Sequence, residues 1–133
     1  MRLRISIAVA VLAICSFVTP RSLQAHHSIA NFWDANAEIT ITGMVKEVKL
    51  VNPHSELTLE VMEDGKPVKW LAFGLGITDL RRRGITNDML MGKKLTLHGN
   101  PPKRSGGKGI FMQQIVFEDG NTINIREDRG SRD

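Results

Sequence analysis

The sequence predicts an all-β fold interrupted by one short helical connection. Several short segments alternate apolar and polar side chains, which is the period of a half-buried strand. Asp-Gly pairs at 64–65 and 119–120 are typical of hairpin turns. Between the third and fourth alternating segments, residues 78–91 carry helix-capping residues and glycines instead. Together these observations indicate strands joined by tight turns, with a single helical interruption.

Residues 1–25 are typical of a secretory signal peptide that is removed from the mature protein. Arg2 and Arg4 give a positive n-region, residues 5–18 carry no charge, and Ala25 precedes the expected cut. The apolar run is shorter than the roughly 20 residues that span a bilayer, so we expect no membrane anchor after cleavage. The sequence therefore predicts a periplasmic protein.

Cleavage changes the chemistry of the chain. Cys15, after an apolar stretch, supports a lipoprotein signal as the competing interpretation, although the bulky Ile14 stands where such signals need a small residue. Cleavage after residue 25 removes this only cysteine and excludes thiol ligands. Three of the 18 Lys and Arg are also removed, so the formal net charge falls from +4 to +1. This near-neutral charge and the shortage of aromatic residues argue against a nucleic-acid partner.

The mature chain is expected to open with an arm and a long first strand. Phe32 or Trp33 would hold the arm against the core. From residue 39 the pattern becomes β, with Ile39 and Ile41 on one face. Met44, Val48 and Leu50 then fall on the other face. We therefore expect a bulge or sharp coil near Gly43.

The second and third strands are expected as a hairpin over residues 57–62 and 68–73, after a turn containing Pro53. In the helical connection, Thr78 can cap a turn that Gly84 ends, and residues 86–88 can cap another turn.

A fourth strand follows at residues 95–98, then a loop at 100–109 that we expect to be mobile. Residues 110–117 form a fifth strand, and Ile123 and Ile125 form the inward pair of a sixth.

This order predicts a small OB-fold-like barrel of five to six strands with a short helical connection. Another small β-barrel or a β-sandwich are the alternatives. The domain is expected to cover residues 26–127, and residues 128–133 to form a disordered tail.

The mature sequence resembles domain-of-unknown-function family 6152, a family of small exported bacterial proteins. The most specific features are Ala25-His26-His27-Ser28 and Asn52-Pro53-His54. Further matching features are Asp34 with Gly43, Trp70 with Phe73, and Leu80 with Arg82 or Arg83 before Gly84. Two places depart from the family pattern: residues 74–76 replace an acidic and Ser-Pro turn, and Ile85 replaces a common Trp. The resemblance implies export and this fold, and it implies no activity.

Three histidines form the candidate metal site. If cleavage follows Ala25, His26 presents its α-amine and its imidazole together, and His27 adds a third nitrogen. His54 would be a further ligand from the turn that Pro53 stiffens. An α-amine loses its proton at about pH 7.7 to 8.0 and an unperturbed imidazole at about 6.5, so these nitrogens are available near neutrality. The affinity order of divalent metals favours copper over zinc or nickel.

Other interpretations of the same residues remain open. His26 and His27 could be polar residues at a frayed terminus, and His54 could bond a backbone carbonyl. His98 alternates with buried leucines, so we expect it to face outward and do not count it as a ligand.

The rival hypothesis is a metal-free adaptor for a protein, peptide or glycan partner. Residues 81–83 with Lys93 and Lys94 could form a basic patch, but such runs are usually solvated faces. The sequence suggests no nucleophilic side chain paired with a general base, so we expect that the protein is not an enzyme.

Overall fold

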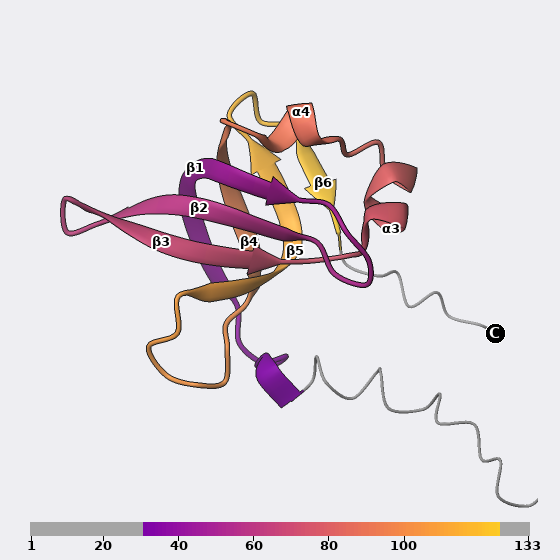
Figure 1. Cartoon of the computed structure of the whole chain (residues 1–133). Coiled ribbons are helices and arrows are strands. Elements are labelled where there is room, and N and C mark those ends of the chain that lie inside the picture. Colours follow the sequence, from indigo (N-terminus) through magenta and orange to yellow (C-terminus); the bar gives the residue numbers. More distant parts are fainter. Residues whose placement is uncertain (1–30, 126–133) are drawn as a thin grey trace, which may run out of the picture.

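The computed structural model describes residues 31–125 of the 133-residue chain (Figure 1). The expected signal peptide, His26, His27 and the expected C-terminal tail lie outside the described residues. The elements follow in the order β1 (Ile39–Lys49), β2 (Glu56–Glu63), β3 (Lys66–Phe73), α3 (Ile77–Arg82), α4 (Asn87–Leu90), β4 (Lys94–Asn100), β5 (Gly109–Phe117) and β6 (Thr122–Asn124).

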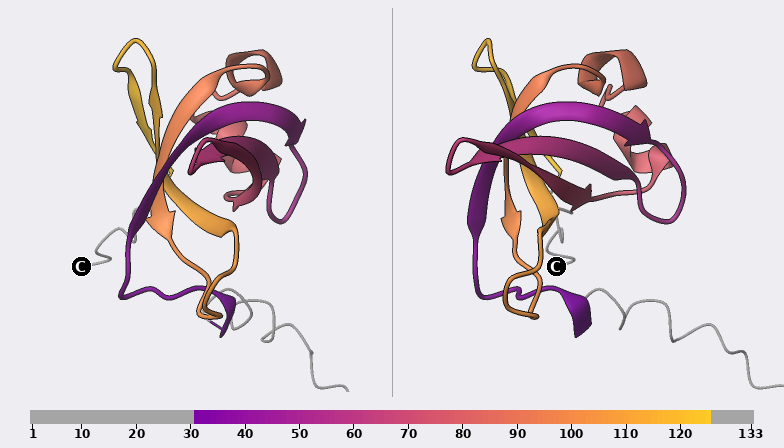
Figure 2. Two further views of the ribbon diagram at one scale, coloured as in Figure 1. Left: turned by 90° about the vertical axis from the view of Figure 1, so that its left-hand side faces the viewer. Right: turned by 60° about the vertical axis from the view of Figure 1, so that its left-hand side comes forward.

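Five of the strands form a closed ring, and the sixth strand pairs at its side. β1 pairs with both β2 and β4, β2 pairs with β3, and β4 pairs with β5. A short parallel pairing of Leu71–Phe73 with Gly109–Phe111 closes the ring between β3 and β5. β6 forms a hairpin with the second half of β5 (Figures 1 and 2). The predicted all-β fold of five to six strands, with a helical connection between the third and fourth, is confirmed.

β1 supplies two walls of the ring because it bends. Its first half, Ile39–Met44, pairs with β4, and its second half, Met44–Lys49, pairs with β2. The expected change of face at Gly43 is wrong, because the register shift lies between Val45 and Glu47. Met44 therefore points outward and is 38% exposed. A β-bulge at this shift adds one residue to β1, and the added residue turns the side chain of Val48 back toward the core.

Gly43 has a different role from the expected one. It is buried, and a Cβ at this position would lie 2.7 Å from the backbone oxygen of Glu60. Glycine therefore permits the close approach of β1 and β2 at the bend.

The core fills the ring and the space beneath the two helices. All strands except the short β6 contribute buried side chains, as does the residue that follows it, Ile125. The buried apolar residues are Ile41, Val45, Leu57, Leu59, Val61, Ala72, Leu80, Ile85, Leu90, Leu95, Leu97, Ile110, Met112, Ile115 and Ile125. Because Ile123 packs against this cluster, the expected inward pair of the sixth strand is confirmed. Within residues 31–125, no helix has the length and apolar composition needed to cross a membrane.

The turns largely follow the predicted chemistry. Asp64 and Gly65 both have positive φ, at 50° and 76°, which is the conformation that a tight two-residue hairpin requires. Gly84, with φ of 75°, ends the first helical turn as expected. Thr86 occupies the N-cap of α4, but the expected cap at Thr78 is wrong, because α3 begins earlier with Gly76 at its N-cap.

The arm before β1 is held by Trp33 rather than by Phe32. The Trp33 ring lies 5.6 Å from Phe73 and 5.8 Å from Phe111, measured between centroids, whereas Phe32 is 69% exposed. The arm also pairs with the loop between β4 and β5, where Lys103 N donates to the Phe32 carbonyl over 2.9 Å. Both segments lie together at the bottom of Figure 1. The mobility expected for residues 100–109 stays a prediction.

A charged cluster joins the β2–β3 hairpin to the end of the same loop. The Glu63 carboxylate accepts hydrogen bonds from Trp70 Nε1 at 2.6 Å and from Lys108 Nζ at 2.5 Å. Lys108 Nζ also lies 5.3 Å from the centroid of the Trp70 ring. The hydrogen bond from Lys108 and then the one from Trp70 lower the pKa of Glu63 below its usual 4.5.

We expect Glu63→Gln to lower the melting temperature at neutral pH, with a difference that narrows in acid. The wild-type carboxylate is stabilised in the folded state, so its contribution is present above its unfolded pKa of about 4.5 and is lost as the pH falls through the lower folded pKa. Gln resembles the protonated acid, so the difference in melting temperature between the two proteins should be smaller at about pH 3 than at pH 7. An undiminished difference in acid would contradict the role of the charge.

Candidate site at the β1–β2 turn

The turn between β1 and β2 is fixed by backbone hydrogen bonds to the segment that leads into α3. Ser55 N donates to the Leu75 carbonyl at 3.1 Å, and Gly74 N donates to the Ser55 carbonyl at 3.0 Å. Ile77 N donates to the Val51 carbonyl at 2.9 Å. The two segments therefore form one unit, although the bonded residues are 19 to 26 positions apart in the sequence.

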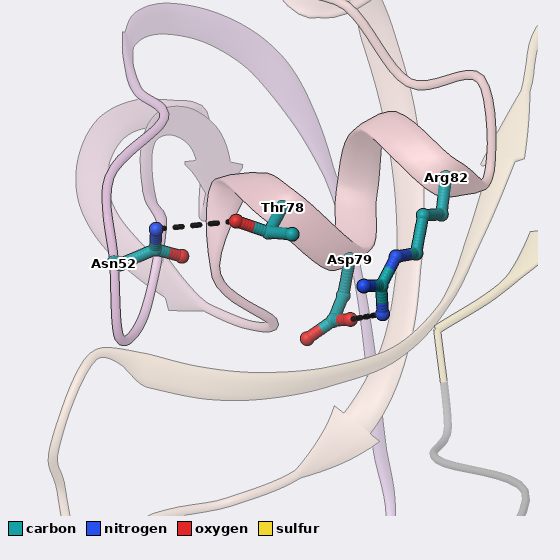
Figure 3. A network of polar contacts seen from close by, with 4 residues as sticks. All are labelled: Asn52, Thr78, Asp79 and Arg82. Carbon is teal, nitrogen blue, oxygen red and sulfur yellow. Dashed lines mark hydrogen bonds and ion pairs between the residues drawn. The ribbon is translucent and has the colours of Figure 1, made fainter.

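Side chains reinforce this unit from within and from outside. Ser55 is fully buried, and its hydroxyl donates to the Val51 carbonyl at 3.2 Å. Asn52 precedes a cis peptide bond to Pro53, and its Nδ2 donates to Thr78 Oγ1 at 3.3 Å. Figure 3 shows this bond reaching the first turn of α3. Thr78, expected as a helix cap, therefore accepts a bond from the turn instead.

Gly74 and Gly76, which lead into α3, are both close to neighbouring atoms. A Cβ on Gly74 would lie 2.8 Å from Met112 Cε. A Cβ on Gly76 would overlap Asn52 Oδ1 and would lie 2.8 Å from the Pro53 carbonyl oxygen. The Gly-Leu-Gly segment thus allows the turn to pack directly on the start of α3.

His54 is oriented by this unit. Its Nδ1 lies 3.1 Å from the Gly74 carbonyl oxygen, and the side chain is half-buried. A carbonyl oxygen can only accept, so Nδ1 carries the proton, and in the neutral ring the lone pair is then on Nε2. Such a backbone bond to one ring nitrogen is how proteins orient a histidine that binds a metal through the other. The carbonyl contact that the sequence left as an alternative is therefore present.

An aromatic cluster connects His54 to the arm. The His54 ring packs edge-on against Phe111, with centroids 6.3 Å apart. The same Phe111 ring contacts Trp33 at 5.8 Å, and Trp33 belongs to the arm. The start of the described chain and the β1–β2 turn therefore share one contact residue.

The proposed ligands are only partly within the described part of the chain. His54 is placed, whereas His26 and His27 lie before residue 31. Among residues 31–125, no group of three His, Cys, Asp or Glu side chains could hold a metal ion. Sequence reasoning found His54 but missed the Gly74 carbonyl and the Phe111 ring that orient it. No local pattern could have revealed these contacts, since Gly74 follows β3 and Phe111 lies in β5, both far from His54 in the sequence.

His98, Arg82 and Arg83, which are among the other residues considered for a site, have structural partners. His98 faces outward as expected, with Nδ1 2.8 Å from Thr40 Oγ1. In the arginine run, Arg82 pairs with Asp79 at 3.2 Å (Figure 3), and Arg83 donates to the Asn124 carbonyl at 3.2 Å. These contacts fit a solvated face better than a basic binding patch.

One comparison with known proteins gives a match. A family model described as a family of unknown function (DUF6152) matches residues 13–111, which is most of the chain. The match includes the β1–β2 turn, the Gly-Leu-Gly segment and the contact between Trp33 and Phe111. A search of curated proteins finds no match.

Proposed function

We propose, for a chain that belongs to the family of unknown function DUF6152, that the mature protein is a non-enzymatic periplasmic protein that binds a transition metal, with copper preferred. The ligands are the α-amine and imidazole of His26, the imidazole of His27 and Nε2 of His54. Its role is that of a carrier or buffer.

The observation that carries the proposal is the hydrogen bond between His54 Nδ1 and the Gly74 carbonyl. It directs the proton to one ring nitrogen and leaves the other as a ligand without any rearrangement. A histidine with both ring nitrogens bonded to protein groups would argue against metal binding. Among the described residues, His54 Nε2 has no hydrogen-bond partner.

The length of the arm supports the same assignment. His26 is seven residues before Trp33 in the sequence. An extended segment of that length reaches up to about 25 Å, at about 3.3–3.6 Å per residue. Trp33 and His54 both contact Phe111, so this reach is ample for the terminal amine to meet the His54 ring.

We expect His54→Ala to weaken Cu(II) binding by at least about tenfold while the fold is retained, because an imidazole ligand is lost. The protein should be exported with its own signal, its N-terminus established by intact mass, and Cu(II) affinity measured by competition with a chromophoric chelator. His98→Ala is the matched control, because His98 is also a half-buried histidine but lies on the outer sheet face. It should bind Cu(II) like the wild type.

Equal affinity of His54→Ala and wild type would overturn the three-histidine site. An intact mass that corresponds to an N-terminus other than His26 would overturn the chelate formed by the α-amine and imidazole of His26.

A further inference from the structure

The outer face of β1, β4, β5 and β6 carries two continuous rows of uncharged side chains. Thr40, His98, Gln114 and Asn124 lie opposite one another in successive strand pairings. The second row consists of Thr42, Thr96, Val116 and Thr122. Between them, Ile41, Leu97 and Ile115 point into the core. We call the eight outward residues the polar face. The left view of Figure 2 shows α3 and α4 on the other side of these strands.

The polar face differs from the other outer surface of the same sheet. On β1 and β2, the outward positions include charged residues that pair across the strands, with Lys46 3.3 Å from Glu60 and Lys49 3.8 Å from Glu56. Such pairs are the ordinary means of solubilising an exposed sheet. The polar face has no charged residue over four strands, in a chain in which 24% of residues are charged.

The side chains of the polar face are held in place by one another. Thr40 Oγ1 bonds His98 Nδ1 at 2.8 Å, and Thr42 Oγ1 bonds Thr96 Oγ1 at 2.8 Å. Gln114 Nε2 donates to Asn124 Oδ1 at 2.8 Å. Each pair still has donor or acceptor capacity, such as His98 Nε2 and Gln114 Oε1. Groups fixed before binding lose less conformational entropy when a ligand is bound. The strands space these groups at about 4.8 Å.

We propose that the polar face binds a neutral, hydroxyl-rich glycan chain laid across the strands. Repeated hydroxyl groups match a row of fixed amide, hydroxyl and imidazole groups, because each can both donate and accept. The missing charge disfavours anionic polymers, which need Lys or Arg contacts. A protein partner would need a central aromatic or arginine anchor, and the polar face supplies only Val116 as an apolar residue. This site is separate from the proposed metal site.

The test is a set of ¹H–¹⁵N NMR titrations of the mature protein with three neutral hexasaccharides, namely cellohexaose, chitohexaose and maltohexaose. At least one should shift the amides of β4, β5 and β6 that carry the polar face, with those of β2 and β3 unchanged. His98→Ala and Gln114→Glu should each weaken that binding by about fivefold, the equivalent of one hydrogen bond. Lys46→Gln, on the charged outer surface, should leave it unchanged.

Failure of all three sugars to shift these amides up to about 10 mM, a concentration well above typical weak binding, would overturn the proposal. Shifts confined to other strands, or stronger binding of an alginate oligomer than of the neutral sugars, would overturn it as well. His98→Ala separates the two sites, because it should weaken glycan binding by about fivefold and leave Cu(II) binding unchanged.

Discussion

Replacing Trp33 with alanine is expected to lower the free energy of unfolding by about 2 kcal/mol, roughly half the loss for a fully buried tryptophan. Trp33 is half-buried against Phe73 and Phe111. Its ring also packs closely on Gly109, where an added Cβ would lie 3.3 Å from the ring. Its removal takes away the side chain that fixes the arm to β3 and β5. Under the proposed function, Cu(II) affinity should fall as well, although no ligand is changed.

Phe32→Ala is the matched control for this prediction, because Phe32 is the neighbouring aromatic residue and is 69% exposed. Its unfolding free energy should change by less than about 0.5 kcal/mol, as for other exposed sites. Urea unfolding of both variants, followed by circular dichroism, measures the difference. Equal losses in the two variants would show that the arm is not held through Trp33.

Replacing Gly76 with alanine is expected to lower the free energy of unfolding by about 1–3 kcal/mol, the range for overpacking. The backbone of Gly76, with φ of −64°, accepts any residue, so the effect comes from space alone. Asn52 could rotate away, but the Pro53 carbonyl oxygen, 2.8 Å from the added Cβ, belongs to the backbone. The β1–β2 turn must then move, and the His54 ring with it.

Gly74→Ala tests whether the backbone contact is the cause. A Cβ there would meet only the flexible end of Met112, at 2.8 Å from Cε, and a methionine side chain can repack. The loss should therefore be smaller than for Gly76→Ala. NMR shifts of the His54 ring should change in Gly76→Ala and stay close to wild type in the control. The opposite ranking of the two variants would contradict the packing described for the turn.

The strands and turns could be predicted from the sequence because their signals are local. Alternation identified β2 and β3, and Asp64-Gly65 identified their hairpin, since positive φ favours these residues. The position of the β1 bulge could not be predicted. The register shift lies between Val45 and Glu47, and neither residue is of a type that distinguishes a bulge from a regular strand. The parallel contact of β3 with β5 depends on how the whole ring closes.

The candidate site was only partly predictable for the same reason. The Asn-Pro-His sequence identified a stiff turn with a histidine in it, and this could be read locally. Whether His54 faces solvent or a partner depended on Gly74, twenty residues later, and on Phe111 in β5. The same dependence on distant residues explains Thr78, whose hydroxyl bonds Asn52 instead of capping its own helix.

In the proposed site, one Cu(II) ion is bound jointly by the N-terminus and the β1–β2 turn. Pulsed electron paramagnetic resonance of the exported protein with one equivalent of Cu(II) tests this most directly, because it counts the coordinated imidazoles. We expect one coordinated imidazole fewer in His54→Ala than in the wild type, and an unchanged number in His98→Ala. An identical number of coordinated imidazoles in wild type and His54→Ala would mean that His54 is not a ligand, and would overturn the proposed site.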